Sequence, residues 1–444
     1  RIAPSPTGKF HIGTARTALV NYIFAKQNNG QFLLRMEDTD KERNKIEFED
    51  DIKNGLNWLG LNWDGEIVYQ SKRVKRYQEI VEVLVKSNCV YEKDGAVWFK
   101  VPDNKTIEFD DLVRGRVKFE SSDLKDFVIL RSDNSPIFYL TGVVDDYDSK
   151  ITHVIRGEEH LSNTPKQILI LKALGFNVPI YAHLPLILNS DKSKISKRKD
   201  PVSITNDFKD KGYLPEAMIN YLFLLGFHPI EKFQNPNNKV QLSSKFQNPN
   251  SKTIDIYSID EMIKTFNIER VQKGGAVFDI EKLKNINHIY IQRIPDDVLT
   301  EKLINYQGKN KSDVFARFVS VIKSRLNYYS EIKEVLVWLE SPVNYTPHQL
   351  IYKKSDKVTT RKALKLIYSA LTKLVTYEVE NIQGVIENVV QDNKFQNGDV
   401  YWSVRVALSG LEKSPPPQEL IWILGKEESL KRINFAINKL NIEN

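Results

Sequence analysis

Two kinds of hydrophobic periodicity divide this sequence, and the division constrains its fold more than any other feature. Through the first 200 residues, short apolar runs alternate with amphipathic stretches of helical period, as at residues 11–27 and 74–87. From Tyr213 onward, almost every apolar pattern has the period of a helix. Because alternating strands and helices build a parallel sheet covered by helices, we predict an α/β doubly wound, Rossmann-like domain followed by an all-α half.

Residues 90–130 interrupt the first domain with short β-like pieces, which predict a small inserted lobe. Further along, the string Lys-Phe-Gln-Asn-Pro-Asn at residues 232–237 recurs at 245–250 without periodicity, so we expect a solvated low-complexity insertion at 231–252. The predicted divisions are 1–89 with 131–200 for the Rossmann-like domain, 90–130 for the lobe, 201–300 for a helical domain and 301–444 for a final all-α domain.

Composition narrows the class of protein. A chain of 444 residues is long enough for roughly two to four domains. A single cysteine, Cys89, excludes an internal disulfide and any cysteine-based structural zinc site, and we expect it to be a buried packing residue. No apolar run approaches the roughly 20 residues of a membrane span. The net charge of +7 permits a nucleic-acid partner without requiring one.

The first motif with chemical content is a Pro/Gly loop at residues 3–13, between a short apolar strand and a helix start. This arrangement presents backbone N–H groups to a phosphate. Gly8 and Gly13 leave room for close approach, and His11 at the mouth of the helix can donate to a phosphoryl oxygen. Taken alone, the segment is equally consistent with an ordinary strand-to-helix turn that has a capping histidine.

A second motif is the basic loop at residues 189–199, which follows the apolar run 183–188. Loops dense in charge are usually solvated surface. In a doubly wound fold, however, loops after strands line the ligand crevice, where lysine side chains would stabilise charge on a pyrophosphate leaving group. The occurrence of both motifs in one chain matters more than either one.

Together these strings resemble the two signature motifs of class I aminoacyl-tRNA synthetases in their glutamyl form. The resemblance rests on Arg-x-Ala-Pro-Ser-Pro-Thr-Gly with His-Ile-Gly at residues 1–13 and Lys-Ile-Ser-Lys-Arg at 194–198. Thr14 stands where many synthetases of the class have a second histidine, and glutamyl enzymes often have a small residue there. Further strings that match the family in order lie at residues 34–40, 143–146, 154–160, 163–167, 278–283 and 405–410.

The resemblance implies an enzyme that activates L-glutamate with ATP to glutamyl-adenylate and then esterifies the terminal adenosine of a tRNA. It assigns catalytic roles to His11, Lys194 and Lys197, and magnesium is expected only as the counterion of ATP, with no metal site of the protein's own. The ATP-binding residues that it implies are Pro6, Thr7, Gly8, His11, Gly13, Lys194, Ile195, Ser196, Lys197 and Arg198.

For glutamate, the resemblance implies two guanidiniums for carboxylate recognition, Arg1 and Arg156, with Ser5 as a hydroxyl donor and Glu37 facing the ammonium group. Outside these matching strings, Arg156 or Glu37 would be expected only to form a structural ion pair. Phe138 falls on the family's pocket tyrosine.

The pocket also departs from the family. Gly142 falls on an asparagine found in many members, so one hydroxyl and one amide are missing. A reoriented Tyr139 is a candidate substitute, although strand alternation would point it to the opposite face from Phe138.

The resemblance extends to tRNA. It makes residues 90–130 a shortened acceptor-binding insertion, 201–300 a stem-contact domain and 301–444 an anticodon-binding domain. Arg114 and Arg405 lie in matching strings and are expected to contact tRNA. The expected partners are tRNA(Glu) and L-glutamate, with charging of tRNA(Gln) left open, and the family expectation is a monomer.

Three alternatives stay open at this point. A relative that glutamylates a modified tRNA base lacks the helical half, and a glutamine-specific enzyme differs around residues 194–198. A catalytically inactive tRNA-binding paralogue would explain Phe138 and Gly142 but not the retained phosphate motifs. The sequence of residues 154–167 favours an intracellular enzyme of a plastid-type organelle stroma, with bacterial cytoplasm and mitochondrial matrix as alternatives.

Overall fold

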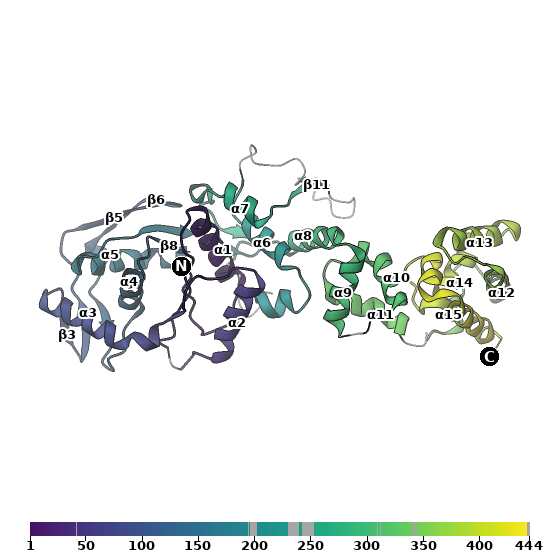
Figure 1. Ribbon diagram of the computed structural model, residues 1–444, viewed down its shortest axis with the longest axis horizontal. Coiled ribbons are helices and arrows are strands. Elements are labelled where there is room, and N and C mark those ends of the chain that lie inside the picture. The colour runs from purple at the N-terminus through teal and green to yellow at the C-terminus, as the bar shows by residue number, and fades with distance from the viewer. Residues whose placement is uncertain are drawn as a thin grey trace. The chain divides into compact units, whose positions relative to one another are not determined.

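The chain forms two compact units, residues 1–287 and 288–444, in a computed structural model (Figure 1). The residues that the structure describes are 1–40, 42–193, 195, 202–229, 239–241, 253–308, 310, 312–340 and 344–441. The division at 287/288 comes from the packing of the chain. The finer boundaries at 89/90, 130/131, 200/201 and 300/301 stay predictions.

A mixed four-stranded sheet, in the order β6-β5-β9-β8, is the framework of the first unit. Strands β8 (His153–Gly157) and β9 (Ile180–Leu184) are parallel, with Val154 opposite Tyr181. Strand β5 (Thr106–Asp111) joins β9 in parallel, and β6 (Gly115–Glu120) pairs antiparallel with β5. Two strands from the predicted lobe therefore extend the sheet that carries the crevice.

Shorter sheets complete the β structure of this unit. Strands β3 (Val90–Lys93), β4 (Ala96–Phe99) and β7 (Phe127–Leu130) form an antiparallel sheet, so the β-like pieces predicted between 90 and 130 are confirmed. An isolated parallel bridge joins Ile2 to Leu34. The remaining pairs are parallel β1 (Arg35–Met36) with β2 (Val68–Tyr69), parallel β10 (Ile187–Leu188) with β13 (Ala276–Val277), and antiparallel β11 (Lys239–Gln241) with β12 (Thr253–Asp255).

Helix α1 (Ile12–Gln27) positions the first motif, and it packs against β8 (Figure 1). Its Ile12, Leu19 and Ile23 are fully buried, and burying such a side chain stabilises by about 1.5–3 kcal/mol. The other helices of the unit are α2 (Ile46–Trp58), α3 (Val74–Lys86), α4 (Phe138–Asp148), α5 (Thr164–Ala173), α6 (Pro215–Leu224), α7 (Ile259–Thr265) and α8 (Ile280–Arg293), the last of which crosses the division.

Every regular element among the described residues of the second unit is a helix, as the 3.6-residue periodicity predicts. Helix α15 (Pro417–Lys439) packs against α12 (Lys357–Lys373) and α14 (Asn397–Ser409). It is kinked at Gly425, whose φ of 75° favours glycine. The other helices are α9 (Asp296–Gln307), α10 (Asp313–Ile322), α11 (Ile332–Glu340) and α13 (Val379–Asp392). In the described part of the chain, no helix is long and apolar enough to cross a membrane.

Three sequence predictions need correction. Phe138 and Tyr139 begin helix α4, so the strand alternation expected there is wrong. The apolar run 183–188 is not one strand, because Pro185 separates β9 from β10. Cys89 is only half-buried and packs at the edge of the core.

Candidate active site

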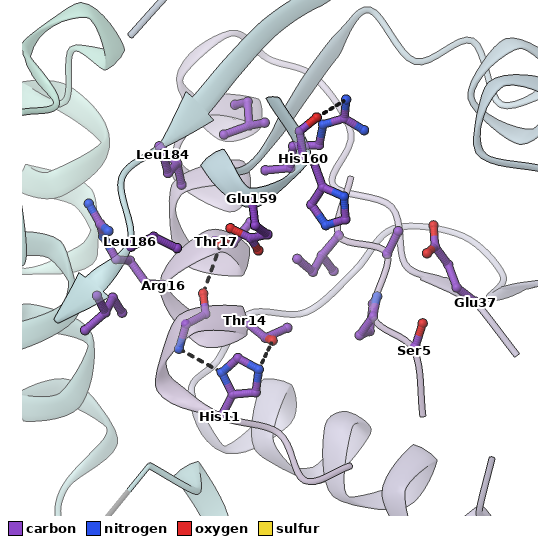
Figure 2. Close-up of a pocket in the computed structure, with 18 of the residues that line it drawn as sticks. Ser5, His11, Thr14, Arg16, Thr17, Glu37, Glu159, His160, Leu184 and Leu186 are labelled. Atoms are coloured by element: carbon purple, nitrogen blue, oxygen red, sulfur yellow. Dashed lines mark hydrogen bonds between the residues drawn. The ribbon is translucent and has the colours of Figure 1, made fainter. Parts of the chain in front are cut away.

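A cavity of about 490 Å³ lies in the first unit, at the carboxyl ends of β8 and β9. Ligands bind at this end of the strands in open α/β sheets. Gly157 and Leu184, which end the two strands, contribute to its wall. Much of the rest of the wall comes from the N-terminal loop, the start of α1, the β1 region, the turn after β8 and the segment after β9 (Figure 2). Residues of α4 and α5 also contribute to it.

His11 caps the start of α1 inside this cavity. Its Nδ1 accepts a hydrogen bond from the Gly13 N–H at 3.2 Å, and its Nε2 lies 3.2 Å from Thr14 Oγ1 (Figure 2). An accepting Nδ1 places the ring proton on Nε2. Because the first turn of α1 has no acidic residue, the positive end of the helix dipole is available to an anion.

Asp146 joins two arginines beside the cavity. Its carboxylate accepts from Arg1 Nε and Nη2, both at 2.9 Å, and from Arg35 Nη1 at 2.5 Å. Arg35 also donates to Glu37 Oε1 at 3.1 Å. Burial alone would raise the pKa of Asp146, but the two guanidiniums outweigh it and hold the pKa well below its usual range. The pair of Arg1 and Glu37 predicted for glutamate is thus part of one buried ionic network.

Asp145, the residue before Asp146 on α4, is held by a separate set of hydrogen bonds. It accepts from Arg73 Nε at 2.7 Å, from Gln70 Nε2 at 2.8 Å and from the Tyr77 hydroxyl at 2.9 Å. Burial raises its pKa despite these partners. Residues 145 and 146 therefore point their carboxylates into two different hydrogen-bond networks that fix the position of α4.

Arg156 is held by a chain of hydrogen bonds at the other side of the site. Its Nε donates to His183 Nε2 at 3.2 Å and its Nη2 to Thr164 Oγ1 at 2.8 Å, while His183 Nδ1 lies 2.6 Å from Asp111 Oδ2. Burial lowers the pKa of Arg156 to about 10, so the guanidinium is still charged at neutral pH. Burial also lowers the pKa of His183, which favours the neutral ring that can accept from Arg156.

Phe138 lines the cavity, with its ring 6.2 Å from that of His160 between centroids. Tyr139 does not line it. The Tyr139 hydroxyl is 3.4 Å from Asn163 Oδ1 and accepts from Lys166 Nζ at 3.4 Å. It therefore does not replace the hydroxyl that Phe138 lacks.

Most of the predicted ligand residues meet in this one cavity. Pro6, Thr7 and Gly8 are on the loop that leads to it but are not part of its wall. Lys194, Ser196, Lys197 and Arg198 lie outside the described residues. The predicted residues that line the cavity are Arg1, Ser5, His11, Gly13, Glu37, Phe138, Arg156 and Ile195.

The two predicted tRNA contacts lie elsewhere. Arg114 pairs with Glu158 and donates to the Lys273 carbonyl at 2.7 Å. Arg405 is half-buried on α14 of the second unit. Their roles toward tRNA stay predictions.

Sequence reasoning missed several residues of the wall. Arg16 is buried and donates to the Pro185 carbonyl at 2.9 Å, and burial lowers its pKa to about 10. A signal for its burial existed, because Arg16 lies four residues after Ile12 and three before Leu19, on the apolar face of the helix. Glu159, His160 and Gln167 fall in strings that match the family, so a signal for them existed. Within the described ranges, no three His, Cys, Asp or Glu side chains are grouped as a metal site requires.

Comparison with known proteins supplies the class. The family described as "tRNA synthetases class I (E and Q), catalytic domain" matches residues 1–97 and 91–285, and "Anticodon binding domain" matches 298–437. The doubly wound domain, its crevice at the strand ends and these matches define a class I aminoacyl-tRNA synthetase.

The relatives specify the family. The chain is 37% identical to a glutamate–tRNA ligase of Aquifex aeolicus over 99% of both chains, and 35% identical to that of Lawsonia intracellularis over 98% and 97%. A crystal structure of a glutamate tRNA ligase from Elizabethkingia meningosepticum, in complex with its amino acid, superposes with a TM-score of 0.83 at 27% identity over 99% of both chains. The chain belongs to the glutamate–tRNA ligase family.

Proposed function

We propose that this ligase joins L-glutamate to the 3′ end of tRNA(Glu) through a glutamyl-adenylate formed from ATP. The observation that carries the proposal is the single cavity where the capped start of α1 meets Arg1, Glu37 and Arg156. The start of α1 suits a nucleotide phosphate, and the charged side chains suit an amino acid with two carboxylates.

In the first step, an α-carboxylate oxygen of glutamate attacks the α-phosphorus of ATP and pyrophosphate leaves. His11, with its proton on Nε2, and the backbone N–H groups at the start of α1 contact the phosphates. Lys194 and Lys197 stabilise the charge that develops on pyrophosphate. Magnesium arrives with ATP and is held by phosphate oxygens and water. Pro6, Thr7, Gly8, Ile195, Ser196 and Arg198 complete the proposed nucleotide site.

Charged side chains of opposite sign to the groups of the substrate account for glutamate recognition. Arg1 and Arg156 offer planar donors to carboxylate, Ser5 offers a hydroxyl, and Glu37 accepts from the ammonium group. Phe138 supplies an apolar wall. Because Arg1 and Arg156 are both largely buried, their interactions with a carboxylate are less screened by water than those of surface arginines.

In the second step, a hydroxyl of the terminal tRNA ribose attacks the glutamyl carbonyl and AMP leaves. The second unit supports an anticodon-binding role for residues 301–444, with 90–130 and 201–300 contacting the acceptor stem and neighbouring stem. Arg114 and Arg405 are the proposed tRNA contacts, tRNA(Gln) is a second candidate acceptor, and the enzyme acts as a monomer. The plastid-type stroma stays a prediction, which a targeting extension encoded by the full gene would support.

The test is charging with radiolabelled glutamate, with purified tRNA(Glu) and tRNA(Gln) in parallel. Charging of tRNA(Glu) alone identifies a discriminating enzyme, and charging of both identifies one whose second product needs a later amidation. If tRNA binds but neither is charged, the inactive-paralogue alternative is correct and the proposed function is wrong.

A further inference from the structure

Gln167 places its amide at the wall of the cavity. It lies on α5, is 5% exposed, and lines the cavity together with Gly142 and Phe138. Among the described residues, its amide has no hydrogen-bond partner. Neither amide atom is one of the fully enclosed side-chain atoms that lack a partner, so the amide is accessible and can bind a ligand from a cavity that it borders.

Gly142 is the residue that makes room for this amide. Helices α4 and α5 pack against each other, and a Cβ built on Gly142 would lie 3.2 Å from Gln167 Nε2 and 3.9 Å from Arg35 Nη2. Even a Cβ at 142 would therefore require the Gln167 amide to shift by a few tenths of an ångström. The absence of a side chain at 142 and the position of the Gln167 amide are therefore one feature of the packing.

Gln167 also borders a second cavity of about 390 Å³, whose wall includes Asn177 and Ile180. Two observations favour the first cavity for the amide. Nε2 is the Gln167 atom nearest to Gly142, and Gly142 lines only the first of the two cavities. Moreover, Arg35 beside it holds Glu37, the proposed acceptor for the ammonium group.

We infer that Gln167 is a glutamate-contacting residue, whose amide can reach the substrate because position 142 carries no side chain. The inference rests on the proposed assignment of this cavity to glutamate. It also gives this wall an amide although Gly142 has none, because α5 supplies it across the helix contact. Gly142 then sets specificity indirectly, by leaving the Gln167 amide in place.

The test measures glutamate KM, ATP KM and kcat, with direct glutamate binding by calorimetry, for Gln167→Leu. Leucine is one bond shorter than glutamine and removes the amide without introducing another polar group. Loss of a hydrogen bond to a charged substrate group should raise the glutamate KM about tenfold or more, with the ATP KM and kcat nearly unchanged. Asn177→Leu, which removes an amide from the second cavity, is the matched control and should have no effect.

A double-mutant cycle tests the link between the two helices. Gly142→Ala should shift the Gln167 amide by a few tenths of an ångström and raise the glutamate KM several-fold. Alanine is the better helix former, so unfolding would not explain that loss. In the Gln167→Ala background the same change should have no effect, because there is no amide to displace.

Arg156→Lys separates failure of this inference from failure of the proposed site. If it raises the glutamate KM while Gln167→Leu leaves it unchanged, the glutamate site is correct and Gln167 is only a packing residue. If Asn177→Leu raises the glutamate KM as Gln167→Leu does, the amide acts through the second cavity and the inference is overturned. If neither Arg156→Lys nor Gln167→Leu changes it, the assignment of the cavity to glutamate is itself wrong.

Discussion

His183 accepts the Nε–H of Arg156 at 3.2 Å, and this contact fixes the protonation of the buried ring. The acceptor must be a bare Nε2, so the ring proton is on Nδ1, 2.6 Å from Asp111 Oδ2. Asp111, His183 and Arg156 thus form a chain in which each group has one compatible hydrogen-bond role. The proposed carboxylate-binding arginine is thus oriented by two residues that are not part of the cavity wall.

Asp111→Asn should reverse the hydrogen-bond directions between residue 111, His183 and Arg156. Asp111 Oδ1 accepts from the backbone N–H groups of Val113 and Arg114 at 2.9 and 2.8 Å, so the oxygen of an asparagine must stay there. Its NH₂ group would then face His183 Nδ1 and move the ring proton to Nε2, opposite the Arg156 N–H. We expect about a tenfold rise in glutamate KM, measured by pyrophosphate exchange in the presence of tRNA.

A nitrogen-15 NMR spectrum of the imidazole would report the change of tautomer directly. Asp110→Asn, which alters an exposed neighbouring carboxylate, serves as the control and should change neither the spectrum nor the KM. An unchanged KM in Asp111→Asn, together with a changed tautomer, would show that Arg156 does not need this chain.

His183 should also make stability depend on pH. Burial lowers its pKa in the native state, whereas the unfolded ring takes up a proton below a pKa of about 6.5. The unfolded state therefore binds more protons, and the free energy of unfolding should fall as the pH drops from about 7.5 to 5.5. The slope from this residue approaches about 1.4 kcal/mol per pH unit at most.

Urea unfolding across that range measures the slope, and comparison of histidine variants isolates the contribution of His183. The slope should decrease in His183→Asn but not in His228→Asn, which replaces an exposed histidine. Equal slopes in the wild type and in His183→Asn would contradict the neutral buried ring.

Among the carboxylates of the site, neutralising Asp146 should lower the free energy of unfolding most. Asp146→Asn removes the charge that pairs Arg1 and Arg35, and breaking a buried ion pair costs about 3–5 kcal/mol. Asp148→Asn is the matched control on the same helix, because Asp148 pairs with Arg73 and Arg76 near the surface and should cost less than about 1 kcal/mol. Similar losses for both variants in urea unfolding would mean that Asp146 is not effectively buried.

The helix and strand pattern of the first unit could be predicted because periodicity is a local property. Prediction from local periodicity fails at Phe138. The run Ile137–Leu140 is short and apolar, and a run of that length does not separate a strand from the start of a buried helix. Only packing of α4 against α5 decides between them.

The motifs predicted which residues gather in the cavity, but not what holds them. Arg16 meets the Pro185 carbonyl across 169 residues of sequence, and Asp111 meets His183 across 72. The second contact depends on β5 joining β9 at Asp111 and Tyr181. Strand order of this kind is a long-range property that no local pattern encodes.

Lys197→Ala should separate catalysis from tRNA binding. By analogy with the loss of one preorganised donor, it should cost about 2 kcal/mol or more of transition-state stabilisation, roughly 30-fold in kcat. The Kd for tRNA should barely change, because the proposed contact is with pyrophosphate. Lys192→Ala, in the same basic loop but before the motif, is the control and should affect neither. If Lys197→Ala weakens catalysis and tRNA binding equally, the motif supports the fold of the loop rather than the leaving group.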